Sequence, residues 1–371
     1  MSSGANFGCE DLHTSAPPHL RTFRPPHLRT LAAAVTILLL CMSFGSSACD
    51  RLMDRQIENA LQRGDRSILQ SPDLHVVLCG TGSPLPDPER AGACTAVLAG
   101  GEFVLVDVGP GSWETLDLAG LPTGDLSAVL LTHFHSDHIG DLGEAITQSW
   151  IAGRTRPLDV YGPAGATQVV DGFDRAYAAD AGYRTLHHGE EYMPSAAAPA
   201  VGHDVALGEA ADADAVVFDR NGLRVTMFRV RHDPVVPSVG YRFDYRGRSV
   251  VVSGDTAKST SLIAHAAGAD LLLHEALQPE MMSRIAAVAD RVDRKRLAKL
   301  ARDTLNYHTS PVEAAEVARD AGVKTLVFTH MVPGPRNFLM RRMFLAGVHE
   351  VFPGEVVLGE DGMRLTLSPK S

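Results

Sequence analysis

From residue 74 to the C-terminus, short apolar runs alternate with longer amphipathic segments. The short runs are bounded by Gly, Pro, Asn or Asp, which is typical of buried strands. They predict strands at residues 74–78, 94–98, 102–106, 128–131, 158–161, from about 215, 223–231, 238–245, 248–253, 270–274 and 324–329. The longer segments predict helices at about 142–151, 164–179, 279–304 and 311–321. This alternation predicts an α/β fold in a single domain, residues 74–371.

The N-terminal stretch has a different pattern. Residues 1–30 are proline-rich and basic, residues 31–44 are uncharged and apolar, and small residues precede Cys49. This order is typical of an export signal, and the apolar run is short for a spanning helix, which needs about 20 residues. We therefore expect residues 1–48 to be an N-terminal extension with an export signal.

Two processing routes are open at the end of this signal. Ser47-Ala48-Cys49 resembles a bacterial lipoprotein site, with lipid on Cys49. Ser46 departs from that pattern, which favours an aliphatic residue there, so simple cleavage after Ala48 is the alternative. An uncleaved anchor or an overlong start are further alternatives. The expected location is periplasmic or membrane-anchored. Residues 49–73 are predicted to be a linker that contains an amphipathic helix, residues 52–69.

The cysteine pattern excludes two kinds of site. None of the five cysteines has CxxC spacing, so neither a thiolate zinc site nor a thioredoxin-like motif is indicated. Cys79 and Cys94 lie in apolar runs, where buried free thiols are the favoured interpretation and a disulfide is the alternative.

The net charge of −10 also bears on function, because proteins that bind nucleic acid usually carry positive charge to neutralise phosphates. Bound divalent ions would offset part of this negative charge at the site itself.

The densest chemistry follows the predicted strand at 128–131. Within residues 132–138 lie three histidines and one aspartate, a ligand set that suits zinc and its neighbours. His133 and His135 are two positions apart on an extended chain, so both can face one ion. Asp137 and His138 lie past the bend and can serve a second ion.

Four more candidates lie further along the chain. His232, Asp255 and His330 each follow a predicted buried strand, and His308 precedes a predicted helix. Because strand ends converge at one edge of a layered α/β fold, the first three can reach the 133–138 loop. His274 is expected to pack beneath this site.

The motif His133-Phe134-His135-Ser136-Asp137-His138 resembles the HxHxDH signature of the metallo-β-lactamase superfamily. Six further motifs are similar to its ribonuclease Z and arylsulfatase-like branch: Gly80-Thr81-Gly82-Ser83-Pro84, Tyr161-Gly162-Pro163, Gly240-Tyr241-Arg242, Ser253-Gly254-Asp255-Thr256, His308-Thr309-Ser310 and Thr329-His330. The resemblance implies a four-layer αββα sandwich, with two β-sheets face to face, helices outside, and two metals at one edge.

The resemblance also implies roles for these residues. His133, His135 and His232 would hold one metal, Asp137, His138 and His330 the other, and Asp255 would bridge them. Two Zn²⁺ ions are expected, with Mn²⁺ or Fe as alternatives. The nucleophile would be a metal-bridged hydroxide. Asp137 would orient it, and His308 would donate a proton to the leaving oxygen.

The substrate class is less sharply defined. Residues 185–214 contain six acidic residues and no lysine or arginine, unlike the basic arm of ribonuclease Z proteins. The basic helix at 279–304 also carries acidic residues and is interpreted as a solvated face. Arg90 could contact an anionic substrate or stabilise its turn.

We therefore expect a hydrolase of phosphodiester or sulfate-ester bonds in small anionic esters. The alternative is a ribonuclease Z-type endoribonuclease that processes the 3′ end of tRNA. Nucleic acid is thus a possible partner but not the favoured one. A membrane would be contacted through the N-terminal segment or a lipid on Cys49. A homodimer is left open.

Overall fold

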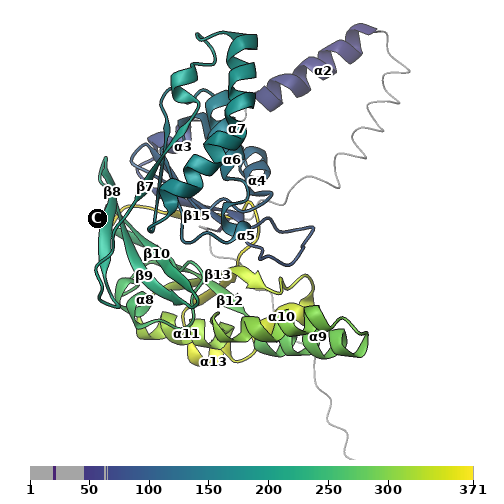
Figure 1. Ribbon diagram of the computed structural model, residues 1–371, viewed down its shortest axis with the longest axis vertical. Helices are drawn as coiled ribbons and strands as arrows, with labels where there is room; N and C mark the ends of the chain where they lie inside the picture. Colours follow the sequence, from purple (N-terminus) through teal and green to yellow (C-terminus); the bar gives the residue numbers. More distant parts are fainter. Residues whose placement is uncertain (1–19, 22–45, 62–63, 65, 371) are drawn as a thin grey trace, which may run out of the picture.

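Two β-sheets stacked face to face form the centre of the molecule (Figure 1). The computed structural model describes residues 20–21, 46–61, 64 and 66–370. Within these ranges the first sheet has the order β1-β15-β2-β3-β4-β5-β6-β7 and the second β14-β13-β12-β11-β10-β9-β8. The predicted αββα sandwich is confirmed.

The strands of the first sheet are β1 (Leu20–Arg21), β15 (Arg364–Leu367), β2 (Leu74–Gly80), β3 (Cys94–Ala99), β4 (Glu102–Val106), β5 (Ala128–Leu130), β6 (Leu158–Gly162) and β7 (Ala200–Asp204). Those of the second are β14 (Glu355–Leu358), β13 (Thr325–Val332), β12 (Leu271–Leu277), β11 (Arg248–Val252), β10 (Val235–Tyr245), β9 (Leu223–His232) and β8 (Asp214–Arg220). In each sheet, one series of neighbouring strands is parallel: β4 to β7 in the first and β11 to β14 in the second.

Helices cover the outer face of each sheet. On the first sheet lie α4 (Ser112–Leu118), α6 (Leu142–Ile151) and α7 (Ala166–His188), and on the second α8 (Thr260–His265), α11 (Pro311–Asp320) and α13 (Val348–Val351). Further helices are α5 (Ser136–Ile139), α9 (Pro279–Arg291), α10 (Lys295–Asp303) and α12 (Phe338–Phe344), with single turns η1 (Thr123–Asp125), η2 (Ser195–Ala197) and η3 (Thr304–Asn306).

Three apolar layers follow from this stacking. The middle layer, between the sheets, contains Val97, Tyr241 and Val250, all fully buried. The outer layers lie between each sheet and its helices, with Trp113 on one side and Phe328 on the other. Because both sheets are covered on both faces, their central strands are continuous apolar runs, as the sequence indicates.

The single helix predicted at residues 279–304 is wrong. The chain forms two helices, α9 and α10, because Asp293 adopts a left-handed backbone conformation with φ of 55° and reverses the direction. The two helices then pack together and bury small side chains: Ala286, Ala289, Ala298 and Ala301. This burial is possible only if the segment folds back on itself.

The region from 164 to 214 is also more ordered than expected. Helix α7 continues to His188, and the stretch expected to be irregular contains η2 and strand β7. β7 pairs in parallel with β6 and forms one edge of the first sheet. Its weakly apolar sequence is explained by this edge position, where only Ala200 is buried.

The interpretation of Cys79 and Cys94 as free thiols is wrong. The two residues form a disulfide between β2 and β3. These strands are antiparallel neighbours, and a register shift between Leu78 and Gly80 brings the two sulfur atoms together. Both cysteines are buried, as expected, but they are paired.

The export signal lies mostly on residues 1–19 and 22–45, outside the described residues. Helix α2 (Ser46–Leu61) already includes Cys49, and α3 (Ser67–Gln70) follows it. The helix predicted at 52–69 is therefore two helices, and the first begins earlier. Among the described residues, no helix combines the length and apolar character that a membrane span requires.

Candidate functional site

The metal-ligand motif lies on the loop after β5. This strand ends at Leu130, and His133 and His135 follow in extended backbone. Asp137 and His138 occupy the short helix α5, so they face the site from a different direction. The Nε2 atom of His133 lies 2.9 Å from Nδ1 of His135, so the two imidazole rings are directed at the same position.

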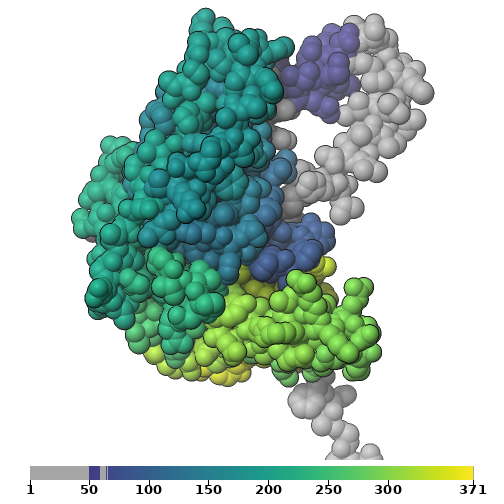
Figure 2. Space-filling view, in the orientation of Figure 1, coloured from purple at the N-terminus to yellow at the C-terminus, as the bar shows by residue number. Residues whose placement is uncertain are grey.

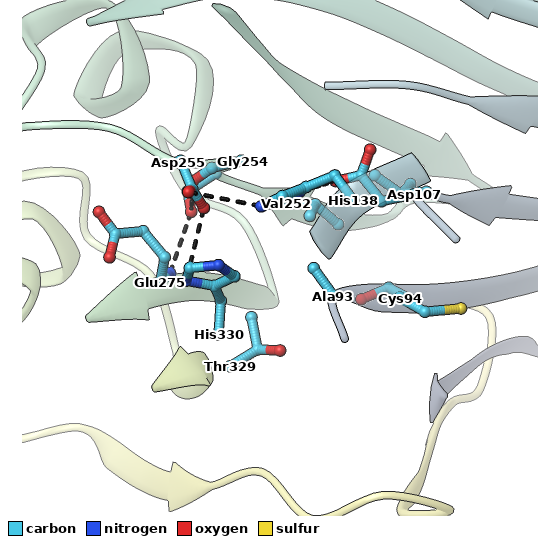
Figure 3. A pocket seen from close by; sticks show the side chains of 13 residues that line it. Ala93, Cys94, Asp107, His138, Val252, Gly254, Asp255, Glu275, Thr329 and His330 are labelled. Carbon is cyan, nitrogen blue, oxygen red and sulfur yellow. Dashed lines mark hydrogen bonds and ion pairs between the residues drawn. The ribbon is translucent and has the colours of Figure 1, made fainter. Parts of the chain in front are cut away.

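The second sheet contributes the remaining donors. His232 ends β9, Asp255 follows β11, and His330 lies within β13. One carboxylate oxygen of Asp255 lies 3.8 Å from His232 Nε2 and 3.4 Å from His138 Nε2. Its other oxygen lies 3.5 Å from His330 Nδ1. Asp255 therefore faces donors from both sheets (Figure 3).

Two backbone distortions aim the second-sheet donors at the loop. His330 has a φ of 40°, at a bulge where Thr329 pairs with Glu275 and Met331 with Ala276. The bulge leaves His330 out of the ladder and turns its side chain toward Asp137, with Nε2 3.1 Å from the carboxylate. Gly254 has a φ of 60°, and a Cβ added there would lie 2.5 Å from the Val239 carbonyl oxygen, so the turn before Asp255 has no room for a side chain.

The donor atoms form three groups, each within 4.8 Å, in the part of the chain that the structure describes. The groups are His133, His135, His232 and Asp255; Asp137, His138 and His330; and Asp255, His308 and His330. Among the described residues, several of their buried polar atoms have no hydrogen-bond partner: Nε2 of His138 and His232, Oδ1 of Asp255, and Nδ1 of His330. Because unpaired buried polar atoms are costly, this convergence fits bound divalent cations.

A second set of contacts fixes the donors. The carboxylate of Asp107 accepts hydrogen bonds from the N–H and hydroxyl of Thr132, at 2.8 and 2.7 Å, and lies 2.8 Å from His138 Nδ1. Nδ1 of His232 donates to the carbonyl of Tyr307 at 3.0 Å. In both histidines Nε2 is left to face the site. Such outer contacts set the tautomer and orientation of metal-binding imidazoles.

The protonation of two donors, His133 and Asp255, suits a cation. Burial lowers the pKa of His133 well below its usual value, which keeps this imidazole neutral. Burial alone would raise the pKa of Asp255, but His330 and His138 lower it well below its usual range. A neutral imidazole and an ionised carboxylate are the forms that bind metal. His138 differs: burial alone would lower its pKa, but Asp255 and Asp107 raise it well above its usual value, so this imidazole must lose a proton to bind metal.

His308 lies at the rim of this cluster, after helix α10. Its Nδ1 is 3.3 Å from Oε1 of Glu275, and the Glu275 side chain is buried. Burial alone would lower the pKa of His308, but Glu275 and Asp255 raise it to about 9. His308 is therefore protonated at neutral pH and can donate a proton.

The sequence analysis missed two residues. Asp107 orients His138, and Glu275 orients His308. Glu275 also accepts hydrogen bonds from the N–H groups of Thr256 and Thr309. Asp107 directly follows the apolar strand β4, and Glu275 lies within the fully buried strand β12, where a buried charge needs a partner. That signal is present in the sequence, but it does not identify the partner.

The other two candidates have structural roles. Arg90 donates to the hydroxyl of Thr81 and the carbonyl of Gly359, so it stabilises its loop, as one of its two predicted roles stated. His274 is fully buried, and its Nδ1 lies 2.7 Å from the carbonyl of Glu275. It packs beneath the site.

Comparison with known proteins places the chain in a family. The model of the beta-lactamase superfamily domain matches residues 103–331. Ribonuclease Z of Mycobacterium bovis (strain BCG / Pasteur 1173P2) is 38% identical over 302 residues, which cover 80% of this chain and 99% of that protein. Ribonuclease Z of Mycobacterium marinum is 39% identical over 263 residues, or 70% of this chain and 87% of that protein.

Solved structures agree on the fold. The short form of human tRNase Z aligns with a TM-score of 0.57 at 23% identity, over 79% of this chain and 99% of that one. The metallo-beta-lactamase fold protein YhfI from Bacillus subtilis aligns with a TM-score of 0.53 at 22% identity, over 79% and 99% of the two chains. The chain belongs to the metallo-β-lactamase-fold hydrolases of the beta-lactamase superfamily, in the branch that includes ribonuclease Z.

Proposed function

We propose that this protein is a metal-dependent endoribonuclease of ribonuclease Z type, which hydrolyses a phosphodiester bond in RNA. The observation that carries the proposal is the convergence of unpartnered donor atoms from both sheets on Asp255. Relatives named ribonuclease Z, which the chain matches over nearly their whole length, support RNA as the substrate. They favour it over the small phosphodiester or sulfate ester that the sequence analysis placed first.

Seven residues would hold the metal. We assign one ion to His133, His135 and His232 and a second to Asp137, His138 and His330, with Asp255 between them. The donor set of imidazole and carboxylate fits Zn²⁺, and Mn²⁺ or Fe are alternatives. When bound, two such ions polarise a phosphate and make water a stronger nucleophile.

The protein's own groups complete the reaction. Asp137, whose carboxylate also contacts His330, would orient the attacking water. His308 would protonate the leaving oxygen, because its proton is retained at neutral pH and lies at the rim of the cluster. Glu275 would act on the reaction only through His308, by holding its ring and its charge.

Three substrates test the proposal with purified, Zn²⁺-reconstituted full-length protein. A tRNA precursor with a 3′ extension should be cut at the end of the acceptor stem, and bis(4-nitrophenyl) phosphate should be hydrolysed slowly. Nitrophenyl sulfate should be untouched. Rapid hydrolysis of the sulfate with an intact RNA would contradict the proposal and restore the small-ester alternative.

We also propose that the enzyme is exported and acts in an oxidising compartment. The Cys79–Cys94 disulfide supports this, because such bonds persist mainly outside the cytosol. The leader pattern of residues 1–48 and Cys49 supports it independently. Trapping of free thiols in intact cells, followed by mass spectrometry, should show the pair oxidised and the chain shortened at its N-terminus. Reduced thiols on an uncut chain would contradict the proposal.

A further inference from the structure

Helices α9 and α10 form an arm that projects from the edge of the site (Figures 1 and 2). The arm begins beside the catalytic rim, because the N–H of Leu277 donates to the Thr309 carbonyl at 2.9 Å. It returns there through η3, which leads directly to Tyr307 and His308. With 13 residues in α9, its far end lies about 20 Å from its base.

The arm is basic in an acidic protein. Residues 279–303 contain seven basic and four acidic residues, while the whole chain carries a net charge of −10. Lys295, Lys299 and Arg302 are paired with aspartates of the arm itself. Four exposed arginines have no carboxylate partner among the described residues: Arg284, Arg291, Arg294 and Arg296.

The arm is packed against the domain at its base. Met282, Ala286 and Ala301 form an apolar cluster with Leu277 and Val332, against which Leu85 packs. The side chain of Gln278 donates to the carbonyl of Met343, which ties the start of the arm to α12. The four arginines are therefore presented on a preformed support, which lowers the entropy lost on binding.

An aromatic residue lies between the arm and the metal-binding donors. The ring of Tyr307 is partly exposed and lies 4.8 Å from the ring of His308 and 5.2 Å from that of His232. Nucleic-acid surfaces commonly combine a basic track for the backbone with aromatic rings on which bases stack. Both parts occur here: the arginines lie on the arm, and the ring of Tyr307 lies beside His232 and His308.

We propose that the α9–α10 arm is a binding surface for the sugar-phosphate backbone of the RNA whose scissile bond lies at Asp255. The inference rests on the proposed function and extends it, because it says which surface holds the substrate beyond the reacting phosphate. The opposite candidate, residues 185–214, carries six acidic residues and no lysine or arginine, and so repels a polyanion.

An anionic membrane is the competing partner. The arm also exposes four large apolar side chains, Val288, Val292, Leu297 and Leu300, and basic helices of this kind can lie on lipid. RNA is favoured because both ends of the arm adjoin the site, through Leu277 and Thr309 at one end and η3 at the other. The test below includes lipid as an outcome.

The test replaces three arginines at the far end of the arm in the full-length, metal-loaded protein: Arg291→Gln, Arg294→Gln and Arg296→Gln. The matched control removes three exposed arginines elsewhere: Arg175→Gln, Arg224→Gln and Arg246→Gln. Binding of a phosphorothioate-substituted RNA is followed by fluorescence anisotropy at several KCl concentrations. Hydrolysis of bis(4-nitrophenyl) phosphate reports whether the metal site is intact.

The arm variant should bind RNA about 10- to 100-fold more weakly than wild type, and its plot of log K against log [KCl] should be shallower by about 2. Hydrolysis of the small ester should be unchanged, and the control variant should bind RNA within about twofold of wild type. Equal RNA binding by the arm variant and wild type would overturn the proposal.

Two other results separate the arm from the proposed function. If wild type binds RNA through the arm but does not cut it, the proposed function fails and the arm proposal stands. If the arm variant loses only its binding to phosphatidylglycerol vesicles, the arm is a membrane surface and the proposal is overturned. The arm proposal is also overturned if wild type neither binds nor cuts RNA.

Discussion

The two sheets supply the candidate metal site in different ways. The first sheet places four donors on a single loop, residues 133–138, directly after β5. The second sheet supplies His232, Asp255 and His330 from three separate strands, and two of these need a distorted backbone, at Gly254 and His330. A local loop forms its half of the site from neighbouring residues, whereas the other half exists only when the whole sheet is folded in register.

The largest expected effect comes from the second-sheet carboxylate that faces both halves. Asp255→Ala should lower RNA cleavage by roughly 10⁴-fold or more, because donors of both metal groups lose their shared neighbour. Mass spectrometry of metals should show that the content of both ions falls.

Asp219→Ala, which removes an exposed carboxylate from β8, is the matched control and should keep full metal content. Retention of both ions by the Asp255 variant would show that the loop half holds metal without the second sheet.

His308→Ala should slow turnover by about 10³-fold, which is within the range for loss of a general acid. Metal content should not change, because Asp255 and His330 retain their other partners. Single-turnover kinetics and metal analysis together separate this loss from the previous one. His187→Ala, an exposed histidine at the end of α7, should behave as wild type. Loss of an ion from the His308 variant would make His308 a ligand rather than a proton donor.

Gly254→Ala tests how strictly the second-sheet half of the site depends on the left-handed turn before Asp255. A Cβ there would lie 2.5 Å from the Val239 carbonyl oxygen, in a left-handed conformation, so we expect a loss of about 3 kcal/mol in the free energy of unfolding. The melting temperature should fall by roughly 6–12 °C.

Gly172→Ala, in α7 with nothing within 4 Å, is the control and should be neutral or stabilising by up to about 1 kcal/mol. If both variants have the melting temperature of wild type, the turn at Gly254 is not under steric constraint.

Metal binding by the first-sheet half of the site should depend on Asp107, which orients His138. Asp107→Asn keeps the shape and tolerates the φ of 58°, but it removes the charge beside His138. Metal affinity, measured by competition with a chelator, should fall about 10- to 100-fold. A variant that binds metal as tightly as wild type would mean that the loop orients His138 without Asp107.

The smallest effect is expected at Asp270, which stabilises the second sheet away from the site. Asp270 directly precedes β12 and contacts Lys324, Arg248 and Lys370. Burial alone would raise the pKa of Asp270, but Lys324 and the N–H of Ser249, with the other two cations, lower it to about 2. A carboxyl with a lowered pKa stabilises the fold above its unfolded pKa of about 4 and loses this effect as the pH falls toward 2.

Asp270→Asn should therefore cost about 2 kcal/mol at pH 7, and the difference from wild type should shrink between about pH 4 and pH 2. Urea unfolding at several pH values measures this, while metal content at pH 7 should be unchanged. A difference that stays constant down to pH 2 would mean that the charge of Asp270 does not contribute.

The contrast between the two halves also explains what could be predicted from the sequence. The 133–138 loop could be identified because its donors are neighbours and share one short motif. His232, Asp255 and His330 could be proposed from their positions after apolar runs and from the family resemblance, since strand ends meet at one edge. The bulge at His330 and the turn at Gly254 could not, because they depend on pairing with other strands.

The errors have the same origin. The turn at Asp293 was missed because the segment around it has a continuous helical pattern, and only the packing of α9 on α10 selects the break. The Cys79–Cys94 pair depends on the register of β2 and β3, which an apolar pattern leaves open. Glu275 and Asp107 were overlooked because a buried acid shows its function only through the residue it contacts.

The extra residue in β13 has a consequence for how this enzyme can vary. His330 reaches Asp137 only because the strand has one more residue there than its neighbour β12. Deleting a single residue between Thr325 and Thr329 would turn the imidazole to the opposite face, although every side chain of the motif would still be encoded. The strand can therefore accept many changes of amino acid, but the number of residues that precede His330 in it is fixed.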